Sequence, residues 1–340
     1  MSVYFDNIIG NEKLKQMLSS YIECNKMPHA FIIEGEAGIG KKTMAKSILA
    51  AMCCKDKEHN IPCTKCINCE KIFKEISSDV FMIGADGKSS IGVEIIRDLK
   101  ATTYLSSNEL DFKGYIISDS DKMTVAAQNS FLKILEEPQT SVVYFLLCEN
   151  SRSMLPTILS RAPTIRMMPI DQKNIKEYLV RSYPHLNNQR CSEISVLCRG
   201  NLGAAIKIAN ENETYRELTN NRKLYLDFFR LLSEKNDKFA FLYIFSKMNE
   251  RNDILIDHLR SLYTMFSDIL KLKLCDECEL DFFESSEEYD KYIKKIKPKC
   301  AKKMSILIEQ TIDKLYYNQG ASSASSIMLD FSIKAWDTNL

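Results

Sequence analysis

The sequence predicts an α/β domain with a parallel sheet around a phosphate-binding loop, followed by an all-helical C-terminal half. The first observation is the apolar run Phe31–Glu34, which leads into a glycine-rich segment and then into a helical pattern. The second is that further short apolar runs alternate with helical patterns, near residues 80–83, 112–118 and 142–147. Strands that alternate with helices in this way form parallel sheets. The third is the stretch after residue 212, which shows helical periodicity and no strand pattern.

The glycine-rich segment reads G-E-A-G-I-G-K-K-T and begins at Gly35. Gly35, Gly40 and Lys41 have the Walker A spacing, and Gly38 is a third glycine within the loop. Such a loop wraps so closely that its backbone N–H groups face phosphate oxygens, and the helix that begins at Lys41 adds the anion-binding end of its dipole. The segment therefore predicts a strand, a phosphate-cradling loop and a helix that runs to about Cys53.

Two positions around this loop depart from what Mg-ATP hydrolysis requires. The hydroxyl that holds Mg²⁺ should follow the loop lysine, but Lys42 stands there and Thr43 comes one residue late. A cation beside the metal position would be unfavourable by several kcal/mol, as an order of magnitude. The strand at 112–118 should end in Asp-Glu, yet Ser118 and Asp119 occupy those places. We therefore expect no Mg²⁺ and no intrinsic ATP hydrolysis, whereas the sequence leaves open whether this degenerate loop still binds ATP.

Polar residues that precede helical patterns are interpreted as helix caps. Asn11 precedes the first apolar helical stripe of the chain, and Asp119 and Asp121 precede the helix expected from about Thr124 to Glu137. Side chains of this kind accept hydrogen bonds from the free N–H groups of a first helical turn. Capping is therefore the favoured interpretation of the two aspartates.

Four cysteines lie within sixteen residues, namely Cys54, Cys63, Cys66 and Cys69. Thiolates at C-x-x-C spacing grip one ion, and four of them satisfy tetrahedral Zn²⁺. The set leaves no open position and has no His or Glu partner, so we expect a structural zinc that contributes roughly 10 kcal/mol of local folding free energy. The adjacent Cys53 is an alternative ligand, and the lone pair Cys275 and Cys278 has no assigned role.

Composition describes an ordinary globular protein without a global charge bias. Of the 340 residues, 45% are apolar and 27% are charged, and the net charge is +1. Such a chain has no overall attraction for nucleic acid or membranes, and a solvated face is the favoured reading of the lysines at 291, 294, 295, 297 and 299. No apolar run reaches the ~18 residues of a membrane span, and the N-terminus lacks a secretory pattern. We expect a cytoplasmic protein whose cysteines are thiols or metal ligands.

The C-terminal half carries apolar residues at helical spacing. Examples are Leu262 with Phe266, and Ile306 with Thr311 and Leu315. Stripes of this kind normally face a protein core. We therefore expect these residues to be buried between long helices.

Two further sequence motifs follow the phosphate loop and the four cysteines. N-S-F-L-K-I-L-E-E-P occupies residues 129–138, and L-P-T-I-L-S-R occupies residues 155–161. Together with the phosphate loop and the four cysteines, these motifs resemble the bacterial DNA polymerase III clamp loader family, within the AAA+ superfamily. The resemblance is strong up to about residue 210. Beyond that residue, the chain resembles the family only in its general helical character.

The resemblance implies a domain organisation and a set of partners. It implies a P-loop AAA+ domain over residues 1–168 with the zinc module at 54–69, a small helical lid over 169–211 and a helical collar over 212–340. The collar of this family joins subunits in a ring. The implied partners are the gamma/tau and delta subunits, the sliding clamp and primed DNA, in a hetero-oligomer that serves a DNA-directed DNA polymerase during DNA replication.

The resemblance also bears on the kind of subunit. In G-N-L-G-A-A, Gly203 stands where the second sensor motif of the family has an arginine that touches the phosphates. The S-R-C motif appears as Ser160, Arg161 and Ala162, so its arginine is retained. In the family this arginine reaches the ATP of a neighbouring subunit, where an arginine finger stabilises the transition state. A damaged own site with a retained arginine finger implies a non-hydrolysing, delta-prime-type subunit.

Two alternatives remain on the sequence alone. The first is an active ATPase of gamma/tau type in which Thr43 replaces the missing hydroxyl after a one-residue shift of the loop, although Lys41 would then lose its place. The second is a zinc-dependent nucleic-acid-binding module in which the P-loop fold is only a scaffold. The near-neutral net charge argues against strong DNA binding by such a module.

Overall fold

The computed structural model describes residues 3–56, 60–85, 90–104, 107–234, 252–274, 280, 282–283, 296–317 and 321–338. The chain divides into two compact units, one formed by Met1–Asn174 with Asn201–Ala204 and the other by Ile175–Gly200 with Ala205–Leu340. Cys275, Cys278 and the lysines at 291, 294 and 295 lie outside the described residues. The expected boundary between a lid and a collar near residue 211 stays a prediction.

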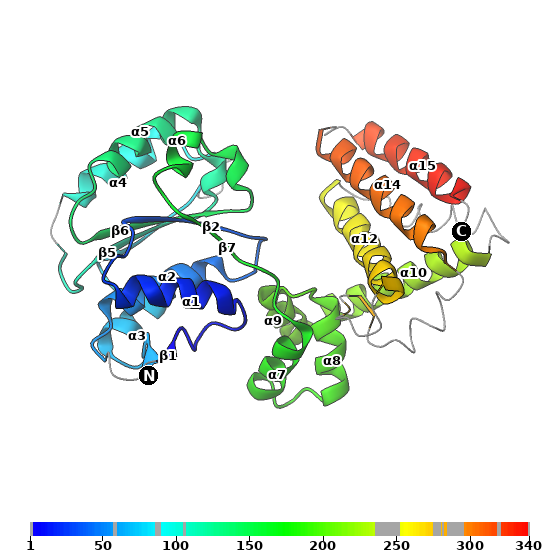
Figure 1. The fold of residues 1–340 in the computed structure, drawn as a ribbon, viewed down its shortest axis with the longest axis horizontal. Coiled ribbons are helices and arrows are strands. Elements are labelled where there is room, and N and C mark those ends of the chain that lie inside the picture. The colour runs from blue at the N-terminus through cyan, green and yellow to red at the C-terminus, as the bar shows by residue number, and fades with distance from the viewer. Residues whose placement is uncertain are drawn as a thin grey trace. The chain divides into compact units, whose positions relative to one another are not determined.

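The first unit is built on a five-stranded parallel sheet (Figure 1). Its strand order is β4-β5-β6-β2-β7, and every neighbouring pair is parallel. The strands are β2 (Ala30–Glu34), β4 (Val80–Ile83), β5 (Lys113–Ile117), β6 (Val142–Cys148) and β7 (Thr164–Arg166). Every residue of β5 and β6 is buried, which is the burial that a parallel sheet covered on both faces produces.

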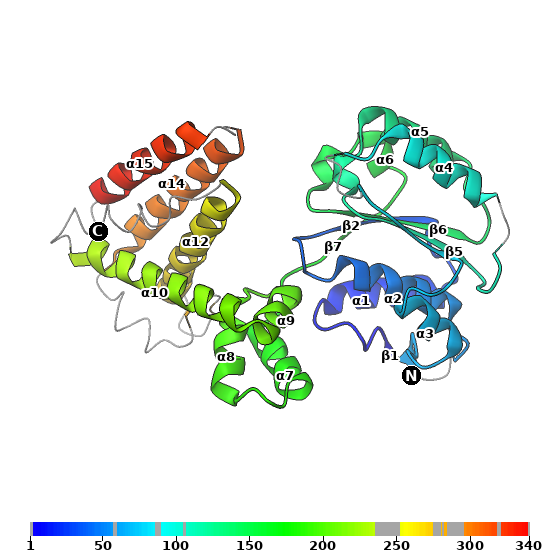
Figure 2. The ribbon, with the colours of Figure 1, turned by 180° about the vertical axis from the view of Figure 1, so that it is seen from behind.

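Helices cover both faces of this sheet, as Figures 1 and 2 show. Helices α1, α2 and α3 lie over one face, and α4, α5 and α6 lie over the other. Their bounds are α1 (Glu12–Glu23), α2 (Lys41–Cys53), α3 (Ile67–Phe73), α4 (Val93–Thr103), α5 (Val125–Glu136) and α6 (Pro156–Leu159). The unit also contains the 3₁₀ turns η1 (Ser120–Lys122) and η2 (Ser151–Ser153) and a small parallel sheet of β1 (Val3–Tyr4) and β3 (Asn60–Ile61). The predicted α/β fold with a parallel sheet is confirmed.

The predicted caps are wrong in detail. Asn11 occupies the N-cap position of α1, but its side-chain oxygen accepts a hydrogen bond from the Met168 N–H at 2.8 Å and its amide donates to the Met168 carbonyl at 3.1 Å. The residue that caps α5 is Thr124, whose hydroxyl oxygen accepts an N–H of the first helical turn. Asp119 and Asp121 do not cap α5, because η1 separates Asp119 from that helix and contains Asp121.

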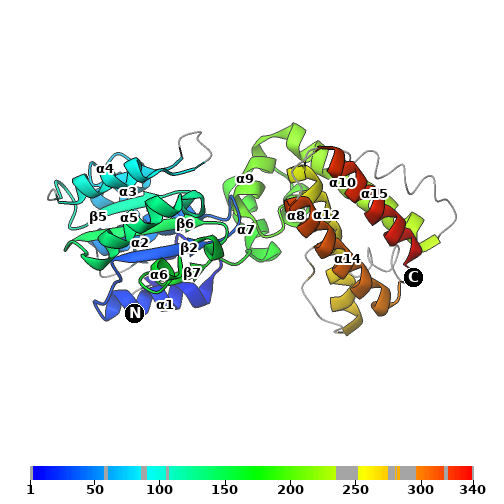
Figure 3. The ribbon, with the colours of Figure 1, turned by 90° about the horizontal axis from the view of Figure 1, so that it is seen from above.

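Within its described residues, the second unit consists of helices and their connecting turns, without a strand. Its helices are α7 (Gln172–Ser182), α8 (Asn188–Leu197), α9 (Leu202–Asn210), α10 (Asn212–Glu234), α12 (Asn252–Leu274), α14 (Pro298–Tyr317) and α15 (Ala321–Asp337), although the first residues of α7 and of α9 fall in the first unit. Helices α12, α14 and α15 pack side by side in chain order (Figures 1 and 3). No helix within the described ranges is long and apolar enough to span a membrane.

Most of the predicted apolar stripes face the core of the second unit, with one exception. Leu262, Phe266, Thr311 and Leu315 are buried, but Ile306 is 45% exposed. Ile306 lies five positions before Thr311, which at 3.6 residues per turn places the two side chains on different sides of α14. The assignment of Ile306 to the core was therefore wrong.

Asp79 fixes the segment that leads into β5. Its buried carboxylate accepts the backbone N–H groups of Asn108, Glu109 and Leu110, at 2.9, 2.6 and 2.9 Å respectively. Burial by itself would raise the pKa of Asp79, but these three donors and the nearby Lys113 charge more than offset it. The pKa of Asp79 therefore lies below its usual range.

Replacing Asp79 by asparagine should lower the free energy of unfolding by about 2 kcal/mol at pH 7, because an amide accepts hydrogen bonds less strongly than a carboxylate. A group whose pKa is lowered by folding contributes stability above its unfolded pKa of about 3.9 and loses it as pH falls through the folded value. The difference between wild type and variant should therefore shrink as pH is lowered from about 4 to about 2. Urea unfolding followed by circular dichroism measures this, with the exposed Asp98→Asn as control. A difference that stays constant over that range would contradict the assignment.

Candidate functional site

The phosphate loop connects β2 to α2 as the sequence predicted. Gly38 and Gly40 have φ angles of 81° and 105°, in the left-handed region where a side chain is strained. The loop therefore requires glycine at both positions. It delivers Lys41 as the first residue of α2, and the Lys41 ammonium donates to the carbonyls of Gly35 and Glu36. The lysine is thus held across its own loop.

Lys42 is the second residue of α2, and its ammonium forms an ion pair with Glu75. Its ammonium is 2.9 Å from a carboxylate oxygen of Glu75, and Lys46 contacts the same oxygen at 2.6 Å. Hydrogen bonds from Lys46 and Lys42 lower the pKa of Glu75. Part of the Lys42 charge is therefore compensated by Glu75, whereas the predicted effect of Lys42 on a metal ion at the loop stays a prediction. Thr43, the next residue, is exposed.

Ser118 and Asp119 follow β5 directly. The Ser118 N–H donates to the Ile83 carbonyl at 2.7 Å and so extends the pairing of β5 with β4. Asp119 has a φ angle of 51°, and its carboxylate lies 3.3 Å from the Lys122 ammonium. The Asp119 carboxylate is therefore paired with a lysine of η1, and its predicted role as a degenerate Walker B residue stays a prediction.

Gly203 lies against the phosphate loop inside the first unit. Its N–H donates to the Gly38 carbonyl at 3.0 Å, and the Asn201 amide donates to the Ala37 carbonyl at 2.6 Å. A Cβ atom at position 203 would come within 2.6 Å of the Gly38 carbonyl oxygen. The close approach therefore excludes any side chain at this position without a shift of the loop.

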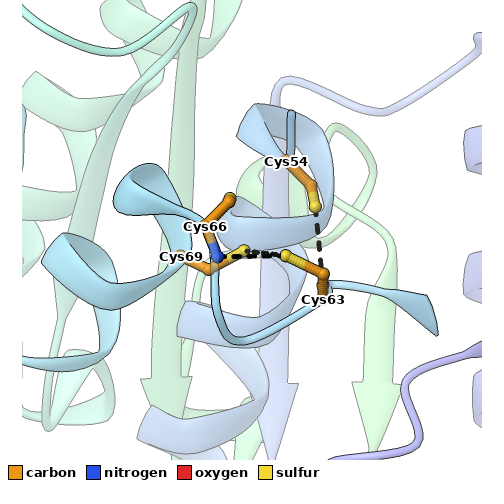
Figure 4. Close-up of side chains that lie close together, drawn as sticks. All are labelled: Cys54, Cys63, Cys66 and Cys69. Atoms are coloured by element: carbon orange, nitrogen blue, oxygen red, sulfur yellow. Dashed lines mark hydrogen bonds between the residues drawn. The ribbon is translucent and has the colours of Figure 1, made fainter. Parts of the chain in front are cut away.

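The four predicted cysteines meet at one point between α2 and α3 (Figure 4). Cys54 follows α2, Cys63 follows β3, Cys66 precedes α3 and Cys69 lies within α3. Their sulfur atoms all lie within 4.8 Å of one another, and four thiolates around one tetrahedral metal ion are about 3.8 Å apart. The cluster could therefore hold a metal ion with only small adjustments.

Backbone donors and burial define the electrostatics of this cluster. The Cys66 N–H donates to Sγ of Cys63 at 3.2 Å, and the Cys63 N–H donates to Sγ of Cys54 at 3.4 Å (Figure 4). Burial raises the pKa of Cys54 and of Cys69. Burial also opposes ionisation of Cys66, but hydrogen bonds, the Lys55 backbone foremost, lower its pKa to about 6. Burial therefore disfavours the thiolate forms of Cys54 and Cys69, which a bound cation would stabilise.

Cys53 does not join the cluster. Its thiol points to the Phe112 carbonyl, with a sulfur–oxygen distance of 4.0 Å, and burial raises its pKa to about 12. The alternative in which Cys53 competes as a ligand is therefore not supported by the geometry. Cys53 is the last residue of α2, whereas Cys54 follows the helix in an extended conformation, and only the Cys54 thiol joins the other three cysteines.

Arg161 lies on the exposed turn between α6 and β7. Its guanidinium donates to the Thr157 carbonyl at 3.1 Å and forms an ion pair with Glu136 at 3.1 Å. The neighbouring Ala162 is buried in the core beneath α5 and α6, so the turn packs without the cysteine of the S-R-C motif. The sequence did not single out Glu136 or Glu75 as partners. Glu136 could have been found from the sequence, since it lies within the motif at 129–138. In contrast, nothing in the sequence around Glu75 indicated its contact with α2.

The sheet order with the P-loop strand between β6 and β7, the glycine loop and the helical second unit define the AAA+ class of P-loop proteins. Residues 10–171, a little under half of the chain, match the family model described as "DNA polymerase III, delta subunit". This part of the chain is similar to that family of DNA polymerase III subunits.

Individual relatives agree with the family. The chain is 26% identical over 290 residues to the DNA polymerase III subunit delta' of Bacillus subtilis, covering 82% of this chain and 83% of the relative. It is also 26% identical over 271 residues to the subunit gamma of Buchnera aphidicola, covering 78% and 74%. Among solved structures, a DNA polymerase III gamma subunit-related protein from Thermotoga maritima superposes with a TM-score of 0.41 at 16% identity, covering 94% of this chain and 99% of the other.

Proposed function

We propose that this chain is a non-hydrolysing, delta-prime-type subunit of the DNA polymerase III clamp loader. In this role it helps to load the sliding clamp on primed DNA and supplies Arg161 to the ATP site of a neighbouring subunit. The observation that carries the proposal is the contrast, within one domain, between the phosphate loop with its surroundings and the turn that bears Arg161. Lys42, Ser118 and Gly203 each replace a group that a working ATP site uses, while Arg161 is present on an exposed turn.

The partners follow from this proposal. A subunit that provides an arginine in trans needs an adjacent gamma or tau subunit whose ATP it contacts, and a delta subunit completes the hetero-oligomer. Such a complex acts on the sliding clamp and on primed DNA in the cytoplasm. The chain itself would not need to bind DNA strongly, in keeping with its net charge of +1.

We also propose that the cysteine cluster holds one structural Zn²⁺. Four sulfur atoms from the described residues lie within 4.8 Å of one another and form a soft donor set with no carboxylate or imidazole among them, which suits tetrahedral zinc. The ion would tie the loop after α2 to α3. ATP and Mg²⁺ are not part of the proposal for this chain's own loop.

The isolated chain should hydrolyse ATP no faster than its Lys41→Ala variant, because neither a hydroxyl at position 42 nor a carboxylate at position 118 is present to hold Mg²⁺. Phosphate release at saturating Mg-ATP, with and without primed DNA, measures this. Robust turnover that the Lys41→Ala change abolishes would establish the gamma/tau-type alternative instead. Strong DNA retention by the isolated chain in a filter assay over a salt series would favour the nucleic-acid-binding alternative.

A further inference from the structure

Three contacts hold the Arg161 guanidinium against its own domain. Nη2 lies 3.1 Å from Oε1 of Glu136, and Nη1 donates to the Thr157 carbonyl at 3.1 Å and to Oγ of Ser160 at 3.3 Å. Within the described part of the chain, Nε of Arg161 makes no hydrogen bond. A planar guanidinium held by Nη1 and Nη2 therefore keeps a donor for an anion that comes from outside.

Only one of these contacts comes from a different element of the fold. Thr157 and Ser160 lie within one turn of Arg161, so they move with α6 and the turn that follows it. Glu136 is the last residue of α5, and α5 packs against α6. The Glu136 carboxylate therefore sets the direction of the arginine relative to the domain as a whole.

We propose that Glu136 is a positioning residue for Arg161. It holds the guanidinium in one orientation on the exposed turn before the neighbouring subunit's nucleotide is engaged. The inference rests on the proposed trans role of Arg161, which it deepens. An arginine side chain has large rotamer freedom, and a restraint that is present before the encounter removes part of the entropy that would otherwise be lost in the transition state.

The exposure of the pair agrees with positioning and not with a buried structural bridge. The side chains are 38% and 52% exposed for Arg161 and Glu136, and a single oxygen–nitrogen contact joins them. Exposed pairs of this kind contribute little to stability. A carboxylate that merely competed with the nucleotide for the guanidinium would have the opposite effect on rate, since its removal would then accelerate hydrolysis.

The test uses ATP hydrolysis by the assembled clamp loader with primed DNA, at saturating concentrations of this chain. Glu136→Gln should lower kcat about threefold to tenfold with little change in KM for ATP, given the modest strength of an exposed pair and the rotamer freedom of arginine. Glu136→Asp, which keeps the charge on a shorter stem, should recover part of the loss. In an Arg161→Ala background, Glu136→Gln should have no further effect, because a residue that acts through Arg161 is not additive with it.

Glu137→Gln is the matched control. Glu137 is adjacent, exposed and of the same type, and it has no ion pair among the described residues. If Arg161→Ala leaves hydrolysis unchanged, the proposed function itself fails. If Arg161→Ala slows hydrolysis but Glu136→Gln equals or exceeds the wild-type rate, or the two effects multiply, the positioning role is refuted while the proposed function stands.

Discussion

Cys69→Ser should release the metal from the cysteine cluster and unfold the segment between α2 and α3. Cys69 is fully buried within α3, and its sulfur lies 3.9 Å from that of Cys63. Binding of a structural zinc supplies roughly 10 kcal/mol to the folding of such a segment, and a serine oxygen does not replace a thiolate ligand. The variant should therefore lose most of that contribution, which is the largest effect we expect from a single substitution in this chain.

The metal content of purified protein and limited proteolysis of the segment 54–75 measure this outcome. Wild type should carry about one Zn²⁺ per chain and resist cleavage there, whereas Cys69→Ser should carry close to none and be cut. Cys53→Ala is the matched control, because Cys53 adjoins the cluster but points to the Phe112 carbonyl. Full zinc occupancy in Cys69→Ser, or loss of zinc in Cys53→Ala, would show that the ligand set is assigned wrongly.

The loss should extend to the phosphate loop, because α2 belongs to both parts. Lys46 donates to the Phe73 carbonyl at 3.3 Å at the end of α3, and Lys42 and Lys46 share the Glu75 carboxylate. When α3 loses its anchor, these contacts from the first turns of α2 are lost with it. Hydrogen exchange of the backbone amides in α2 should therefore become faster in Cys69→Ser than in Cys53→Ala.

Arg161→Ala should leave this chain folded and strongly reduce DNA-stimulated ATP hydrolysis by the assembled complex. The side chain is exposed and its one ion pair among the described residues is of the kind that adds little stability, so the fold should not depend on it. An arginine finger accelerates hydrolysis at the site it contacts on the order of 10³-fold or more. The complex should therefore lose the share of its activity that comes from the neighbouring site.

The control for this experiment is Arg152→Ala, which removes an exposed arginine of η2 from the same domain. That variant should hydrolyse ATP at the wild-type rate. Arg161→Lys should behave like the alanine variant, because an ammonium does not reproduce the planar fork of a guanidinium. Complex activity that is insensitive to Arg161→Ala would argue against the trans role, whatever the state of the chain's own ATP site.

The sequence predicted best those features that depend only on residues close together in the chain. The loop between β2 and α2 and the helix Lys41–Cys53 follow from the glycine spacing and the apolar run before it, since both are set by contacts within one short segment. The four clustered cysteines follow in the same way from their C-x-x-C spacing. The caps were less well predicted, because Asn11 had a distant partner in Met168 that the sequence around it does not indicate.

Other features depend on residues that are far apart in the chain. The ion pair of Lys42 requires Glu75, and the ion pair of Arg161 requires Glu136. Neither ion pair could be predicted from a repeating spacing in the sequence, because each joins the end of one helix to another element. The exclusion of a side chain at Gly203 likewise arises only from the approach of the Gly38 carbonyl.

The amino-acid sequence by itself therefore determined the P-loop architecture, the cysteine cluster and the departures from a working ATP site, because the identity and spacing of neighbouring residues specify them. Tertiary structure alone decided which charges meet, which thiol is left out of the cluster and which glycine is enforced by close packing. The physical reason is that helix and loop formation depend on local backbone preferences, whereas ion pairs and van der Waals exclusion depend on where distant segments are placed by the sheet.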